Sequence, residues 1–175
     1  MNKNSHNRAF VFSLTSALAL ASAVFSVSAF AATSTSNLGV SATILDACTI
    51  AATPVNFGNY DHSAAGATAA TGSVTETCTN GTATVITLGE GLHAAATSVP
   101  GVPVRQMASG ANNLGYFLYS DAGVGTLWGN TPATGVPQVG NGGAGTTLTV
   151  YGRVTAGQNV PTGSYADTVV ATVTF

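Results

Sequence analysis

The sequence predicts an all-β fold of the immunoglobulin-like sandwich type, and three observations lead to this class. Apolar residues alternate with threonine and serine in short runs, which is the period of a half-buried strand. Glycine, asparagine and proline separate these runs, and these residues favour turns. Helical periodicity is nearly absent after the first 31 residues, and about seven short strands with one cysteine pair fit a sandwich of this length.

Residues 1–31 have the pattern of a secretory signal peptide. Lys3 and Arg8 precede an uncharged stretch rich in Ala, Leu, Val and Ser, which ends in the small-x-small sequence Ala29-Phe30-Ala31. We therefore predict cleavage after Ala31. The alternative is an uncleaved membrane anchor, because the apolar run is long enough to cross a bilayer. Its serine content and the cleavage pattern favour a signal that is removed.

The predicted mature chain carries very little charge. Removing 31 of the 175 residues leaves 144, with two basic residues, Arg105 and Arg153, against six acids, and hence a formal net charge of −4. Without lysine the chain cannot neutralise a run of phosphates, so we expect neither nucleic acid nor an anionic membrane surface as a partner. The full 175-residue sequence is 45% hydrophobic, which is not a disordered composition. A weakly charged, exported chain of this kind is suited to assembling with copies of itself.

The two cysteines, Cys48 and Cys78, predict one disulfide, because an even pair in an exported chain is normally oxidised. The bond would close a loop of about 30 residues and contribute roughly 3–4 kcal/mol in the chain-entropy description. A metal site would need more ligands. His62 and His93 are the only histidines after residue 31, and neither has a zinc-like spacing from a cysteine. We therefore expect no metal and no cofactor.

Several segments of the mature chain carry the strand pattern. Residues 73–88 form a predicted hairpin, because Asn80-Gly81 is a strong hairpin-turn dipeptide. Residues 121–146 are expected to be one long glycine-rich connection. The other predicted strands or short extended pieces are 38–44, 55–57, 105–107, 114–118, 148–154 and 165–175.

The two ends of the mature chain indicate an incomplete sandwich. The last predicted strand runs to the final residue, with no further strand to cover it, and its apolar face comprises Tyr165, Val169, Ala171, Val173 and Phe175. Near the other end a second alternating segment precedes Cys48, and its apolar face comprises Leu38, Val40, Ala42 and Ile44. A sandwich that lacks an edge strand and carries a spare one can complete a neighbouring copy by strand addition.

A set of short motifs occurs in a fixed order over nearly the whole mature chain. They are Asp46-Ala-Cys48, Asn56-Phe-Gly-Asn-Tyr60, the segment 72–81, Arg105-x-Met107, Leu114-x-Tyr116-x-Leu-Tyr119, Trp128-Gly129, Val150-Tyr-Gly-Arg153 and Gly163-Ser-Tyr-x-Asp-Thr-Val169, followed by a C-terminal Phe. No single piece is specific. The ordered set resembles the spore coat protein U family, which includes the major pilins of archaic chaperone–usher fimbriae.

The resemblance implies a structural subunit and no enzymatic activity. An incomplete pilin-type sandwich, residues 45–175, would be held by a periplasmic chaperone and passed through an outer-membrane usher. It would be completed by donor-strand exchange, in which residues 32–44 insert Leu38, Val40, Ala42 and Ile44 into the next copy or another pilus subunit. The chaperone would capture the C-terminal strand with Val169, Ala171, Val173 and Phe175. The product would be a surface fibre or a spore-coat-like layer that supports adhesion and biofilm formation.

One residue departs from the family pattern. Glu76 shares a strand face with Val74 and Cys78, where the family usually has an apolar side chain. A buried carboxylate without a partner is costly. The sequence leaves two solutions open: Arg105 or Arg153 pairs with Glu76, or the strand twists this position to an edge.

The sequence contains no convincing catalytic arrangement. Asp61-His62-Ser63 has the residue types of a triad, but adjacent positions in a turn cannot reproduce its convergent geometry, and the scattered acids form no supported pair. The alternative function is a secreted carbohydrate-binding adhesin module, with Tyr116, Tyr119 and Trp128 as a sugar-stacking platform. Aromatic side chains that alternate along a strand more often pack in the core, which favours the structural subunit.

Overall fold

The computed structural model describes residues 30–175, so the predicted signal peptide, residues 1–31, lies almost wholly outside the described residues. The chain divides into two units between Ser41 and Ala42. The described part of the first unit, residues 30–41, has no regular secondary structure, and its side chains are exposed. The second unit contains all the strands.

Ala42–Phe175 forms eight strands and one short 3-10 helix, η1 (Pro132–Thr134). All strand pairs are antiparallel. The strands are β1 (Cys48–Thr53), β2 (Thr68–Cys78), β3 (Ala83–Leu88), β4 (Arg105–Ser109), β5 (Asn112–Tyr119), β6 (Val136–Val139), β7 (Thr146–Val154) and β8 (Ala171–Thr174).

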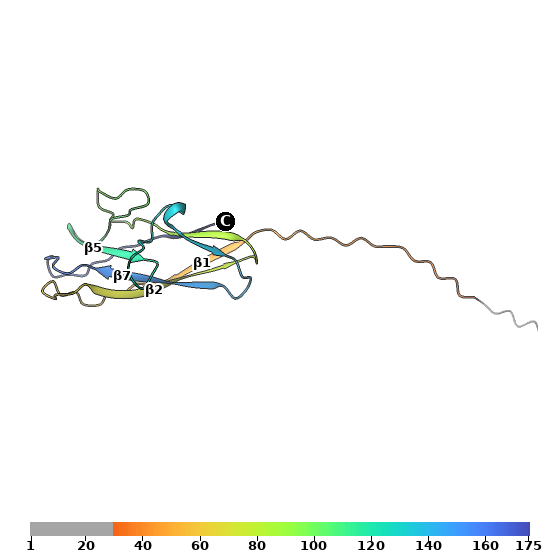
Figure 1. Ribbon diagram of the computed structural model, residues 1–175, viewed down its shortest axis with the longest axis horizontal. Coiled ribbons are helices and arrows are strands. Elements are labelled where there is room, and N and C mark those ends of the chain that lie inside the picture. The colour runs from red at the N-terminus through yellow and green to blue at the C-terminus, as the bar shows by residue number, and fades with distance from the viewer. Residues whose placement is uncertain (1–29) are drawn as a thin grey trace, which may run out of the picture. The chain divides into compact units, whose positions relative to one another are not determined.

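The strands form two sheets that enclose one core, as the sequence predicted. The five-stranded sheet has the order β1-β2-β7-β5-β4, and the three-stranded sheet has the order β6-β3-β8. Figure 1 shows β2 and β7 side by side in the larger sheet. Because side chains alternate along a strand, one face of each sheet points inward. Each fully buried aliphatic or aromatic side chain on these faces contributes roughly 1.5–3 kcal/mol to the stability of the fold. The buried core residues are Val74, Ile86, Leu88, Leu114, Tyr116, Leu118, Trp128, Val150 and Val154.

The predicted hairpin over residues 73–88 is wrong, although both of its strands exist. Asn80-Gly81 does turn the chain, with Gly81 in the left-handed region at φ +86°. However, β2 pairs with β1 and β7, whereas β3 pairs with β6 and β8. The turn therefore carries the chain from one sheet to the other. The inward faces of β2 and β3 meet across the core instead of sharing a ladder.

The region 121–146 is not one uninterrupted connection, because it contains η1 and β6. Pro137 lies within β6, and proline lacks the N–H that a central strand needs. β6 is an edge strand, which is where proline is tolerated. Conversely, residues 55–57 form no strand, and Val55 and Phe57 pack against the core from a loop.

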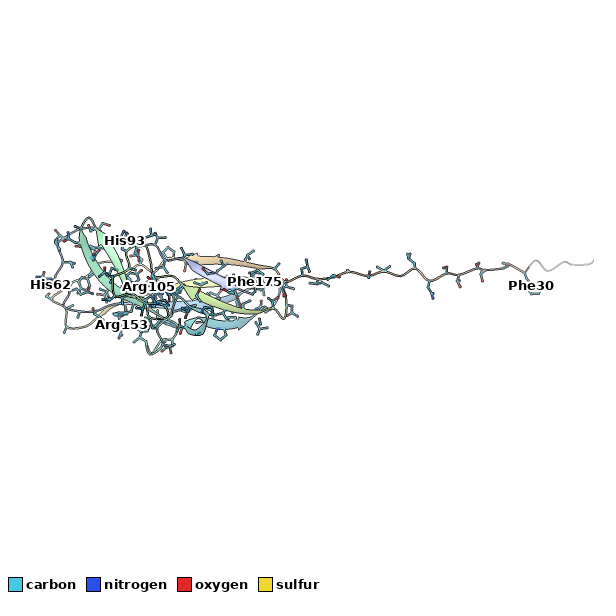
Figure 2. The ribbon with its side chains drawn as sticks, turned by 90° about the horizontal axis from the view of Figure 1, so that it is seen from above. Phe30, His62, His93, Arg105, Arg153 and Phe175 are labelled. Atoms are coloured by element: carbon cyan, nitrogen blue, oxygen red, sulfur yellow. A yellow bond between two sulfur atoms is a disulfide. The ribbon has the colours of Figure 1, made fainter. Side chains whose placement is uncertain are left out.

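Two buried polar side chains tie the sheets together. The Trp128 indole Nε1 donates to the Ile86 carbonyl at 2.9 Å. Arg105, at the start of the edge strand β4, is 1% exposed and donates to the carbonyls of Leu88 at 2.7 Å, Gly89 at 2.8 Å and Trp128 at 2.9 Å (Figure 2). Burial lowers the pKa of Arg105 to about 10, so the guanidinium stays cationic at neutral pH.

Neither solution expected for Glu76 is correct. Glu76 is 1% exposed within the central strand β2, and its partner is Thr84, whose hydroxyl donates to Oε2 at 2.8 Å. Its other oxygen, Oε1, has no hydrogen-bond partner among the described residues. Arg105 is engaged with main-chain carbonyls instead. The hydrogen-bond partner of the buried Glu76 side chain is thus a hydroxyl from the opposing sheet.

The predicted disulfide is confirmed. Cys48 and Cys78 are bonded, and they are direct partners in the β1–β2 ladder with their Cα atoms 4.1 Å apart. The bond ties the first strand of the sandwich to the second.

Replacing either cysteine by serine should lower the yield of exported subunit, because the lost constraint is worth roughly 3–4 kcal/mol for a loop of this size. The matched control is Thr49→Ser, an exposed change in the same strand. Unreduced mass spectrometry should show one intramolecular bridge. Two free thiols in exported protein, or serine variants with unchanged yield, would contradict this prediction.

Candidate functional site

The sandwich has two edge strands that lie close to each other. β1 is at the edge of the five-stranded sheet, β8 is at the edge of the three-stranded sheet, and the two are in contact. Within residues 30–175, β8 pairs with β3 only. Its other side therefore presents main-chain donors and acceptors that a further strand can pair with.

A groove of about 1110 Å³ lies between the sheets. Its walls include residues of the main core, namely Val74, Leu118 and Val150 from the larger sheet and Leu88 from β3. Protein interiors normally have few voids larger than a water molecule. A groove of this size, lined by core side chains, indicates a sandwich whose apolar filling is incomplete.

The C-terminal segment forms one wall of this groove. Val169 and Ala171 line it, and together with Val173 they pack against the core. Phe175 is 58% exposed, at the end of the domain where β1 begins (Figure 2). β8 is shorter than the predicted strand 165–175. Before Ala171 this segment forms only an isolated β-bridge, between Ala166 and Ala108.

A buried hydrogen-bond network holds the chain before β8 in place. Asp167, whose side chain is buried, accepts from the Tyr116 hydroxyl at 2.6 Å and from the Leu92 main-chain N–H at 2.9 Å. His93 Nδ1 lies 3.2 Å from the same carboxylate. Burial, and then the bond to Asp167, raises the pKa of Tyr116 well above its usual range, so Tyr116 remains a donor. Tyr116 and Asp167 both lie in the ordered sequence motifs, but those motifs do not indicate that the two side chains meet.

A second set of polar contacts involves Tyr60 and Gln158, which also line the groove. The Gln158 side chain pairs with the main chain of Gly115 in both directions, each bond being 2.8 Å. Tyr60 donates to the Thr155 carbonyl at 3.0 Å and accepts from the Gln158 N–H at 2.8 Å. The walls of the groove are thus held by hydrogen bonds even though its interior is unfilled.

The four residues predicted to form the donor face are exposed. Leu38 and Val40 are each 88% exposed and Ile44 is 78% exposed, and Ala42 is exposed as well. Residues 42–47 have no regular secondary structure, and β1 starts at Cys48. None of the four belongs to the core of the sandwich or to the side chains packed against it.

The alternative in which three aromatic side chains form a sugar-stacking platform is wrong, and the favoured core packing holds for two of them. Tyr116 and Trp128 are buried in the core, so only Tyr119 of the three faces outward.

The triad-like residues Asp61-His62-Ser63 lie in an exposed local turn. Asp61 accepts hydrogen bonds from the Ser63 hydroxyl and from the Ser63 main-chain N–H, and these bonds lower the pKa of Asp61.

Residues 30–175 contain no group of three or more His, Cys, Asp or Glu side chains placed to hold a metal ion. The same residues include no helix with the length and apolar character needed to traverse a bilayer.

Comparison with known proteins gives a consistent result. The family model of the Spore Coat Protein U domain matches residues 34–172. Protein U of Myxococcus xanthus is 45% identical over 174 residues, which cover 91% of this chain and 97% of that protein.

A solved structure shares the fold. It is a chain in the crystal structure of the CsuC–CsuE chaperone–tip adhesion subunit pre-assembly complex from the archaic chaperone–usher Csu pili of Acinetobacter baumannii. The TM-score is 0.55 at 21% identity, over 76% of this chain and 40% of that chain. This chain thus spans less than half the length of the solved chain, and the similarity concerns the fold.

Proposed function

This chain belongs to the spore coat protein U family, and we propose that it is a structural subunit, not an enzyme, that is exported and polymerises at the cell surface. The product is a chaperone–usher fibre or a coat-like layer that supports adhesion and biofilm formation. The observation that carries the proposal is the unfilled groove next to β8, combined with an exposed, alternating apolar segment outside the core. The signal peptide is residues 1–31, the donor strand residues 32–44 and the sandwich residues 45–175.

In this proposal the donor strand of one subunit lies along β8 of the next. The free edge of β8 supplies main-chain hydrogen bonds, and Leu38, Val40, Ala42 and Ile44 enter the groove. Burying a Leu, Val or Ile side chain contributes roughly 1.5–3 kcal/mol, so several inserted side chains drive assembly strongly. A second copy of the same chain supplies the missing apolar filling.

The partners before assembly are a periplasmic chaperone and an outer-membrane usher. A chaperone strand on the β8 edge would cover the groove until the donor strand of another subunit replaces it. The solved structure with the same fold comes from a chaperone–subunit pre-assembly complex, which supports this class of partner. The donor strand of another copy of this chain, or of another pilus subunit, then takes the place of the chaperone strand on the β8 edge.

Electron microscopy of the cell surface tests the proposed function. A strain that lacks this gene should lose a class of surface fibres or a coat layer, and the wild-type gene should restore it. Immunogold labelling should place the subunit along the whole structure. An unchanged surface in the deletion strain, together with a purified protein that stays monomeric, would overturn the proposal.

Deleting Val173–Phe175 should abolish periplasmic accumulation of the subunit. The deletion removes half of β8 and an apolar side chain that packs against the core, and with them the edge on which the chaperone acts. The measurement is the amount of subunit in periplasmic extracts that contain the chaperone.

A pair of point variants separates this effect from general damage at the C-terminus. Val173→Asp, at a half-buried position, should reproduce the loss, whereas Thr174→Asp, at an exposed position, should accumulate almost normally. Normal accumulation of the truncated subunit would show that the chaperone acts elsewhere.

A further inference from the structure

The outer face of the five-stranded sheet carries a compact group of aromatic residues around one arginine. Leu114, Tyr116 and Leu118 of β5 point into the core, so Phe117 and Tyr119 point outward. On β7 the same alternation turns Tyr151 and Arg153 outward. Phe117 is opposite Arg153 and Tyr119 is opposite Tyr151, so the four residues form a square block on one face. We call Phe117, Tyr119, Tyr151 and Arg153 the aromatic–arginine patch.

Among residues 30–175, Arg153 has no partner for its charge. Residues 30–175 contain two basic residues of the Lys/Arg type, and the other one, Arg105, is buried. Arg153 forms no ion pair or hydrogen bond with any described residue, and its Nε is buried without a partner. A half-buried guanidinium flanked by aromatic rings interacts with anions more strongly than one in water. The charge therefore favours an anionic ligand.

The tyrosines provide apolar faces and further polar groups. Phe117 and Tyr119 lie with ring centroids 6.2 Å apart and planes inclined by 37°. The hydroxyls of Tyr119 and Tyr151 make no hydrogen bond to the described residues. On the β2 side the ladder neighbours of the patch are Ala69 and Thr71, which are small and exposed. The patch is thus open on that side.

The rest of this outer face differs from the patch. Two pairs of its hydroxyls bond to each other across strands, Thr75–Thr147 at 2.8 Å and Thr53–Ser73 at 2.9 Å. None of the four patch residues lines the groove between the sheets. The patch is therefore separate from the proposed assembly site, and a polymer would repeat it once in each subunit.

We propose that the aromatic–arginine patch binds a carboxylate-bearing sugar unit of an acidic polysaccharide. The guanidinium would donate two parallel N–H bonds to the sugar carboxylate, a geometry that arginine is suited to. The apolar face of the sugar ring would stack on a tyrosine ring, and the tyrosine hydroxyls would bond the sugar hydroxyls. Individually weak sites that repeat along a polymer would hold the polysaccharide through multivalency.

The test is binding to polygalacturonate, with its methyl ester as the matched uncharged probe. Wild-type protein should bind polygalacturonate in a salt-sensitive manner and should bind the ester much more weakly. Arg153→Gln should weaken binding about tenfold or more, since a charge-assisted bond is lost. Tyr151→Ala should weaken it as well. The control is Thr149→Ala, an outward change on the same strand away from the patch.

The alternative outcomes are distinct. Equal binding of acid and ester, no binding of either, or unchanged binding by Arg153→Gln would overturn the proposal. If Arg153→Gln alters lateral bundling of fibres but not polysaccharide binding, the patch is a contact between copies and the proposal is wrong. Circular dichroism of each variant separates binding loss from unfolding. Wild type and variants are compared in the same assembly state, as folded monomers, so the differences between them do not depend on whether the chain polymerises.

Discussion

Replacing Val40 by aspartate should leave the subunit able to fold on its chaperone but unable to extend a fibre. Val40 is 88% exposed and outside the core of the sandwich, so its own domain does not need it. In the proposed assembly the same side chain enters an apolar groove of the next subunit. A carboxylate placed there without a partner loses its hydration, at a cost of several kcal/mol, and loses the roughly 1.5–3 kcal/mol of valine burial.

The experiment co-expresses the variant with its chaperone and follows monomer and polymer on gels. The matched control is Ser41→Asp, which adds the same charge at the neighbouring position on the opposite face of the extended segment. We expect the control to polymerise and Val40→Asp to lose at least about tenfold in polymer yield, because each 1.4 kcal/mol is a factor of ten. Normal fibres from Val40→Asp would show that the donor strand lies elsewhere. Failure of the variant to accumulate even with the chaperone would place Val40 in the subunit's own fold.

Replacing Arg105 by methionine should destabilise the sandwich by about 3–5 kcal/mol, because it leaves buried acceptors without their donor. The guanidinium serves three carbonyls at 2.7–2.9 Å, on Leu88, Gly89 and Trp128. Methionine fills much of the volume but donates nothing. The loss also removes one of the hydrogen-bonded links between the two sheets, the link from β4 to the end of β3.

Urea unfolding of the purified subunit measures this effect, and the fluorescence of Trp128 is a suitable signal because it is the single tryptophan and is buried. Gln106→Met is the control, at the next position of β4, where the side chain makes no hydrogen bond to the described residues. Arg105→Lys should lie between wild type and Arg105→Met, since an ammonium keeps the charge but cannot match three carbonyls in the fork geometry of arginine. A loss below about 1 kcal/mol for Arg105→Met would contradict the role assigned to this residue.

These two residues illustrate what local sequence patterns can and cannot reveal. The alternation around Val40 predicts an extended segment with one apolar face, but nothing in the sequence pattern says which surface covers that face. For Arg105 the sequence suggested only a possible pairing with Glu76, and no local pattern pointed to the main-chain carbonyls that it serves. Its acceptors lie 16, 17 and 23 residues away in the sequence, so no local pattern connects them.

The sequence by itself determined the all-β class, the Cys48–Cys78 bond, most of the strands and, through its ordered motifs, the family. Only the tertiary structure decided which strands share a sheet. Asn80-Gly81 favours a turn in either case, but a turn can return the chain along the same sheet or carry it across the core. The choice depends on how the inward faces of β2 and β3 pack. The same packing brings Thr84 against Glu76, eight residues away in the sequence but on the opposing sheet. The Tyr116–Asp167 contact likewise depends on tertiary structure, because it joins residues 51 positions apart.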